Sequence, residues 1–94
     1  IERQIYGAWT IHKIGKKNVD LDYTMYLYSD GALKIFEDQK VTRIGQWLVS
    51  EDGGFLVLQY SDSQEMFPIE KIAARKLKVR DESETVTFKK IVKF

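Results

Sequence analysis

His12 is the residue whose type most directly suggests catalysis, because it is the only histidine in the chain. Any histidine-based acid–base step, or a Ser-His-Asp triad, would have to use it. No Gly-x-Ser-x-Gly elbow or other nucleophile motif accompanies it. On a strand that turns Trp9 and Ile11 toward the core, alternation turns His12 outward. We therefore expect an inert surface histidine.

Neighbouring carboxylates are the second chemical signal, because acid–base pairs and cation sites both use them. They occur as Asp20 with Asp22, Glu37 with Asp38, Glu51 with Asp52, and Asp81 with Glu82. All four pairs lie at turns, where acidic side chains commonly bind nearby backbone N–H groups. No regular series of oxygen ligands for calcium follows them, and the chain has no cysteine. We expect no metal, no cofactor and no enzymatic activity, although a folded sheet could still bring distant acids together into a glycosidase-like pair.

Turn signals divide the chain into strand-length segments. Clusters such as Ser29-Asp30-Gly31 separate runs rich in Val, Ile, Thr, Tyr, Phe and Trp. These runs predict strands at about 7–14, 22–29, 32–37, 41–50, 54–60, 64–71, 76–81 and 85–92. The linking turns are too short for parallel crossovers, so neighbouring strands pair antiparallel. With 94 residues, the chain is expected to form one all-β domain, residues 1–94, an up-and-down meander of about eight short strands that closes into a small barrel.

Two tryptophans, each two residues after a glycine, set the expected register. Trp9 and Trp47 are large enough to fill much of a small core, so we place both inward. Alternation then gives an inward set of Trp9, Ile11, Tyr26, Tyr28, Leu33, Ile35, Trp47, Val49, Leu56, Leu58, Tyr60, Phe67, Ile69, Leu77, Val79, Val86 and Phe88. Strand 22–29 is ambiguous, because Met25 and Leu27 would serve equally well as its inward pair.

Aromatic residues at one end of the barrel form the candidate ligand site, because tyrosine combines an apolar face with a hydroxyl. This set is Tyr26, Tyr28, Trp47 and Tyr60. A cleft of about 300 Å³ or more beside them would favour a carrier of a small apolar molecule. Hydroxyls that only reach solvent, around a filled barrel, would favour a structural or protein-interaction module.

The same register leaves large apolar side chains on the outer face of consecutive strands. This set is Met25, Leu27, Phe36, Ile44, Leu48, Phe55 and Val57. A contiguous apolar patch of several side chains is typical of an interface. We therefore expect a homodimer or a protein partner on this wall. If strand 22–29 takes its other register, Met25 and Leu27 move inside and the patch disperses.

Charge is balanced overall, at net +1, but basic residues gather near the C-terminus. Residues 71–94 hold 8 Lys and Arg against 3 Asp and Glu, a net charge of +5. Lys76, Lys78 and Arg80 alternate with apolar residues and share one face, typical of a solvated wall that would also suit an acidic partner or lipid headgroup. The wall lacks interleaved aromatics, so we expect no nucleic-acid binding. No apolar run reaches the about 18 residues of a membrane-spanning helix.

Pro68 is the only proline, and it lies within the expected strand 64–71. Proline has no N–H for a sheet ladder, so it is confined to edges and bulges. We expect the barrel to be open or irregular beside this strand.

Short motifs along nearly the whole chain resemble one family. They are Gly7-Ala8-Trp9, Tyr26-Leu27-Tyr28-Ser29-Asp30-Gly31, Gly45-Gln46-Trp47, Leu56-Val57-Leu58, Phe67-Pro68-Ile69 and Leu77-Lys78-Val79. Together they resemble the small bacterial lipocalin-like domains, which are often carried by secreted or envelope-anchored lipoproteins. The resemblance implies a non-enzymatic binding module in an extracellular or bacterial cell-envelope location, in the periplasm or on the outer surface. Because the sequence starts at Ile1 rather than at a methionine, we expect any signal or anchor segment to lie outside it.

Overall fold

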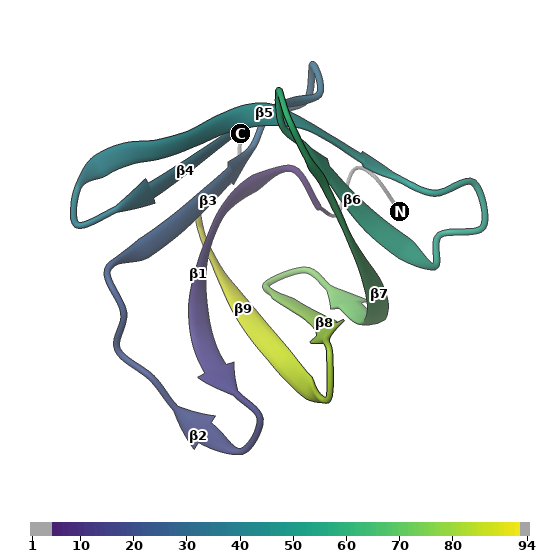
Figure 1. The fold of residues 1–94 in the computed structure, drawn as a ribbon. Coiled ribbons are helices and arrows are strands. Elements are labelled where there is room, and N and C mark those ends of the chain that lie inside the picture. The colour runs from purple at the N-terminus through teal and green to yellow at the C-terminus, as the bar shows by residue number, and fades with distance from the viewer. Residues whose placement is uncertain (1–4, 93–94) are drawn as a thin grey trace.

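Antiparallel strands form almost all of the structure, a computed structural model that describes residues 5–92. The strands are β1 (Gly7–Ile14), β2 (Lys17–Asn18), β3 (Tyr23–Leu27), β4 (Ala32–Glu37), β5 (Lys40–Val49), β6 (Phe55–Gln59), β7 (Gln64–Ala73), β8 (Lys76–Asp81) and β9 (Glu84–Val92). They follow one another around the sheet in the order β2-β1-β3-β4-β5-β6-β7-β8-β9, and β1 also pairs with β9. This pairing closes eight strands into a barrel (Figure 1). The predicted all-β, up-and-down barrel is confirmed. Within residues 5–92, no helix is long and apolar enough to cross a membrane.

The two-residue strand β2 is the element that the sequence did not predict. It folds back on the end of β1, with Lys13 opposite Asn18 and Ile14 opposite Lys17. The turn between them contains Gly15 at φ 62°, a left-handed conformation that glycine adopts without steric cost. β2 therefore extends one end of the sheet without joining the closed ring (Figure 1).

The inward register is confirmed on every strand except β3. There the core contains Met25 and Leu27, with side chains 1% and 0% exposed, in place of Tyr26 and Tyr28. The reason is pairing: Trp9 lies opposite Met25, and opposed residues of an antiparallel pair project to the same face. The other inward residues all belong to the core or pack against it. The alternative register for strand 22–29 is thus the one that the protein adopts.

Both tryptophans are buried, as predicted, and each indole N–H has a backbone partner. Trp9 Nε1 donates to the Ile5 carbonyl at 2.9 Å, and Trp47 Nε1 donates to the Tyr28 carbonyl at 2.8 Å. The Lys90 ammonium lies 4.8 Å from the Trp9 ring centroid, within cation–π range. Because both polar groups are satisfied, the indoles fill the core without leaving a buried donor unpaired.

Pro68 lies at the point along β7 where pairing with β6 ends and pairing with β8 begins. Pro68 is the last residue of β7 that pairs with β6, and it lies opposite Phe55. The pairing of β7 with β8 begins at Ile69 and shifts register before Lys71. Residues 64–68 therefore pair on one side only, and a missing N–H costs no ladder hydrogen bond there. The expected irregularity beside this strand is confirmed.

Gly45 permits a close approach between β5 and β6. A Cβ atom at this position would collide with the backbone carbonyl of Gln59. The glycine before the inward Trp47 is therefore required by backbone packing. It lets β5 stay against β6 while Trp47 reaches the core.

Candidate functional site

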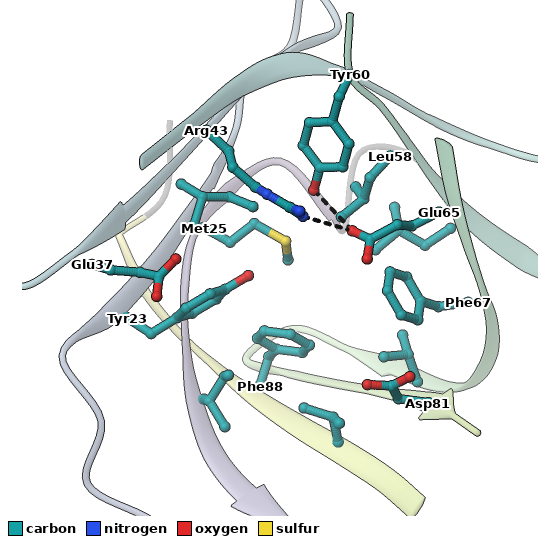
Figure 2. Close-up of a pocket in the computed structure, with 15 residues that line it drawn as sticks. Tyr23, Met25, Glu37, Arg43, Leu58, Tyr60, Glu65, Phe67, Asp81 and Phe88 are labelled. Carbon is teal, nitrogen blue, oxygen red and sulfur yellow. Dashed lines mark hydrogen bonds and ion pairs between the residues drawn. The ribbon is translucent and has the colours of Figure 1, made fainter. Parts of the chain in front are cut away.

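A cavity of about 220 Å³ opens at one end of the barrel (Figure 2). Its inner wall is apolar and is built from seven strands. The apolar lining comprises Ile11, Met25, Ile35, Leu56, Leu58, Phe67, Val79, Val86 and Phe88. The core side chains that do not line it, including Trp9, Trp47 and Leu77, fill the rest of the barrel. The barrel is therefore partly filled and partly hollow, with an apolar chamber of limited size.

The mouth of the cavity carries polar side chains that continue the inward alternation of their strands. They are Tyr23, Glu37, Arg43, Tyr60, Glu65 and Asp81. Glu37 follows Leu33 and Ile35 at two-residue spacing, and Asp81 follows Leu77 and Val79 in the same way. Each of these strands thus changes from apolar to polar as it reaches solvent. The arrangement can hold a molecule with an apolar body and a polar end.

Arg43, Tyr60 and Glu65 form one hydrogen-bonded group at this mouth (Figure 2). Arg43 Nη1 donates to Glu65 Oε1 at 3.2 Å, and the Tyr60 hydroxyl donates to the same oxygen at 3.0 Å. The guanidinium carbon of Arg43 also lies 4.5 Å from the Tyr60 ring centroid. Burial is the main reason that the pKa of Tyr60 is raised, and the nearby Arg43 guanidinium opposes this shift. Both phenol and guanidinium are therefore held in their protonated forms at neutral pH.

Tyr23 is the most enclosed polar side chain of the mouth. Burial raises its pKa strongly, and the nearby Tyr60, Glu37 and Glu65 raise it further. Its ring packs against Phe88, with centroids 6.4 Å apart. Figure 2 shows its hydroxyl directed into the cavity, and no residue of 5–92 makes a hydrogen bond with that hydroxyl. It stays a neutral phenol that can donate or accept a hydrogen bond.

Only one of the four residues expected to bind a ligand lines this cavity. Tyr60 does so, whereas Trp47 is buried in the filled part of the core. Tyr26 and Tyr28 lie on the outer face, 6.0 Å apart at the ring centroids, because β3 takes the register with Met25 inside. Their inward placement was wrong. A contact of any of the four with a ligand stays a prediction.

The seven residues expected to form an outer apolar wall do not share one exposed face. Met25 and Leu27 are core residues, so these two placements were wrong, whereas Val57 points outward as expected but is only 5% exposed. Phe36 packs on Tyr26 with ring centroids 5.2 Å apart, and Phe55 is half-buried. Ile44 and Leu48 remain exposed, as does Met66, which is separated from Leu48 by Val57. Any interface through these residues stays a prediction.

The other residues that the sequence singles out are the lone histidine, the acidic pairs and the basic residues near the C-terminus. His12 is exposed on the outer surface, as expected. Glu37 and Asp81, each from a different turn pair, both line the cavity mouth, from different sides of it (Figure 2). Within residues 5–92, no group of three or more His, Cys, Asp or Glu side chains is placed to hold a metal ion. Of the expected basic wall, Lys76 and Lys78 line a groove that also contains Lys13, Lys16, Arg75 and Lys89, whereas Arg80 pairs with Glu70 at 3.2 Å.

A closed antiparallel barrel with one filled and one hollow end is a lipocalin-like fold. The structure is similar to the crystal structure of a lipocalin-like protein from Bacteroides uniformis, with a TM-score of 0.73 and 13% sequence identity. The match covers 94% of this chain and 99% of that protein. No family model and no curated protein sequence matches the chain. The resemblance in fold is therefore confirmed by structure and not by sequence.

Proposed function

We propose that this domain is a non-enzymatic binding module that holds a small, mainly apolar molecule in the hollow end of its barrel. The observation that carries the proposal is the apolar chamber of about 220 Å³ with a polar mouth. An apolar cavity of about 150 Å³ stays dry and binds benzene. By proportion, this one suits a ligand of about nine non-hydrogen atoms. It is smaller than the cleft of about 300 Å³ or more that was expected for a carrier, and of the four expected aromatic residues only Tyr60 lines it. The proposed ligand is therefore smaller than the drug-sized molecules that sites of about 300 to 1,000 Å³ take.

A catalytic role receives less support from the same geometry. Glu65 is committed to an ion pair with Arg43 at 3.2 Å, whereas a glycosidase needs one carboxyl group that gives up a proton. His12, the only histidine of the chain, does not line the cavity. The chamber therefore favours binding over turnover.

The alternative function is a structural or protein-interaction module with a filled barrel and an apolar outer wall. It depends on exposed apolar area, and the burial of Met25, Leu27 and Val57 removes much of that area. Its remaining support is the exposure of three apolar side chains, Ile44, Leu48 and Met66. We keep it as the second candidate.

We also propose that the domain acts outside the cytoplasm, in an extracellular or bacterial cell-envelope setting, as a secreted protein or lipoprotein. Its support is the resemblance of its motifs to small bacterial lipocalin-like domains. Fractionation of the source cells, with detection of the native protein in each fraction, tests this. Recovery in the cytoplasmic fraction alone would contradict it.

The binding function is tested by titrating the ¹⁵N-labelled protein with 2-phenylethanol and following amide NMR shifts. We expect saturable shifts at cavity residues such as Met25 and Leu58. Val86→Phe should weaken binding because Val86 lines the cavity and the larger ring occupies part of it. The matched control is Val41→Phe at an exposed position. Absence of saturable shifts in the wild type would refute the proposed function.

A further inference from the structure

The cavity mouth carries more negative than positive charge. Among residues 5–92, its lining includes the carboxylates of Glu37, Glu65 and Asp81 and a single cation, Arg43. Figure 2 shows the three carboxylates around the opening, supplied by β4, β7 and β8, with Arg43 on the side of Tyr60. The lining thus has a net charge of −2, although the whole chain has +1.

The one cation that the described part of the chain places at the mouth is already paired. Arg43 Nη1 lies 3.2 Å from Glu65 Oε1, and its guanidinium also stacks over the Tyr60 ring. An incoming carboxylate would have to compete with Glu65 for this guanidinium. The residual charge of the mouth is therefore that of Glu37 and Asp81.

Neither of these two carboxylates is neutralised by a partner among residues 5–92. Glu37 Oε1 accepts a hydrogen bond from the Thr42 hydroxyl at 2.9 Å, a contact that leaves its charge in place. The Asp81 side chain has no hydrogen bond or ion pair within the described part of the chain. Both side chains can therefore accept hydrogen bonds from a ligand.

Tyr23 adds a neutral acceptor below these charges. Its hydroxyl is directed into the cavity and has no hydrogen-bond partner within residues 5–92, while its ring packs on Phe88. An ammonium group at this depth could donate to the phenol oxygen and to a carboxylate at once, because it has three N–H donors. Its apolar part would then lie against Met25 and Leu58.

We infer that the cavity selects small amphiphilic amines, with an apolar body in the chamber and a protonated nitrogen beside Tyr23 at a mouth flanked by Glu37 and Asp81, over carboxylates of the same shape. The inference rests on the proposed function and specifies its ligand class. A carboxylate ligand would place its charge at a mouth that carries two unpaired carboxylates, and like charges repel. An amine gains the opposite interaction.

Three probes that differ mainly in their polar end test this inference: phenethylamine, 2-phenylethanol and phenylacetate. Each is titrated into the ¹⁵N-labelled wild-type protein at pH 7 and low ionic strength, and Kd is obtained from amide shifts. We expect phenethylamine to bind about tenfold more tightly than phenylacetate, with 2-phenylethanol between them. The amine preference should shrink at high salt, because the mouth is solvent-accessible.

Two charge-neutralising substitutions identify the responsible groups. In the double variant Glu37→Gln and Asp81→Asn, phenethylamine should lose about fivefold in affinity while 2-phenylethanol keeps its affinity. Glu51→Gln is the matched control, because Glu51 is an exposed carboxylate that does not line the cavity. Unchanged binding of 2-phenylethanol also shows that the double variant is folded.

The outcomes separate this inference from the proposed function. Tighter binding of phenethylamine that depends on Glu37 and Asp81 supports it. Equal or tighter binding of phenylacetate overturns the amine preference and leaves the binding function in place. The same conclusion follows if the double variant binds phenethylamine as tightly as the wild type does. If none of the three probes binds, the proposed function and the inference both fail. If the double variant loses 2-phenylethanol as well, single Asp81→Asn and Glu37→Gln variants are compared by the same ratio of amine to alcohol affinity.

Discussion

Arg43 and Glu65 meet across the end of β6, although their strands, β5 and β7, do not pair with each other. The contact has an N–O distance of 3.2 Å, and Tyr60, at the end of β6, donates to the same carboxylate. Three consecutive strands are thus joined by side chains at the cavity mouth. Because this group is half-exposed, its role lies more in the shape and charge of the mouth than in the stability of the fold.

Replacement of Glu65 by Gln should change the free energy of unfolding by less than about 1 kcal/mol. The reason is solvent screening, since the side chains of Arg43 and Glu65 are 49% and 42% exposed. Urea denaturation of Glu65→Gln beside the Glu51→Gln control measures the difference. A loss of more than about 2 kcal/mol would mean that the group is a structural clamp.

Tyr23 should make the stability of the fold fall at alkaline pH. Burial, followed by Tyr60, Glu37 and Glu65, raises its pKa in the folded state, so the folded protein keeps a proton that the unfolded chain loses. This contribution is fully present below about pH 10, the unfolded pKa of tyrosine, and is lost as the pH rises toward the folded pKa. Urea denaturation between pH 8 and about 11 should show the decline.

The matched variant for this alkaline decline is Tyr23→Phe, which removes the ionisable group and keeps the ring against Phe88. Its stability should depend less on pH across the same range. Part of the decline should persist, because burial also raises the pKa of Tyr60. An unaltered slope in Tyr23→Phe would show that other groups cause the alkaline loss.

Trp9 and Trp47 should each be essential to the fold. Truncation of a large buried aromatic residue to alanine costs about 3 to 5 kcal/mol, a large part of the about 5 to 15 kcal/mol of a typical domain. Trp9→Ala additionally leaves Lys90 without its aromatic contact inside the barrel. Urea denaturation tests both variants, with Ile44→Ala at a position 64% exposed as the control. A wild-type midpoint for either tryptophan variant would contradict this assignment.

Much of the architecture could be predicted because short turns and alternating apolar residues are local signals. Strand order followed from turn length, and closure followed from the need to cover sheet edges. The register of β3 could not be predicted locally, because Tyr23-Thr24-Met25-Tyr26-Leu27 is apolar on both faces. Pairing with β1 decides it, by placing Met25 opposite Trp9.

The mouth of the cavity was missed for a different physical reason. The inward set expected from the sequence ends at the last apolar residue of each strand, because alternation is followed there only through apolar residues. In the structure the same alternation continues by one polar residue, from Ile35 to Glu37 and from Val79 to Asp81. Extending each strand by one inward position identifies these residues from the sequence, and the register of β3 then adds Tyr23.

The exposed residues Ile44, Leu48 and Met66 allow the second candidate function to be tested. The pairings place Leu48 opposite Val57, and Val57 opposite Met66, on the outer face of β5, β6 and β7. Val57, which lies between Leu48 and Met66, is only 5% exposed. The exposed side chains therefore form separated apolar contacts instead of a continuous patch. Isolated surface apolar residues are normal in monomers, whereas stable interfaces need a contiguous patch. We therefore expect the wild-type chain to sediment as a monomer in analytical ultracentrifugation at high concentration, and Leu48→Lys to sediment identically. A wild-type dimer that Leu48→Lys converts into folded monomers would instead establish this face as an interface between two copies.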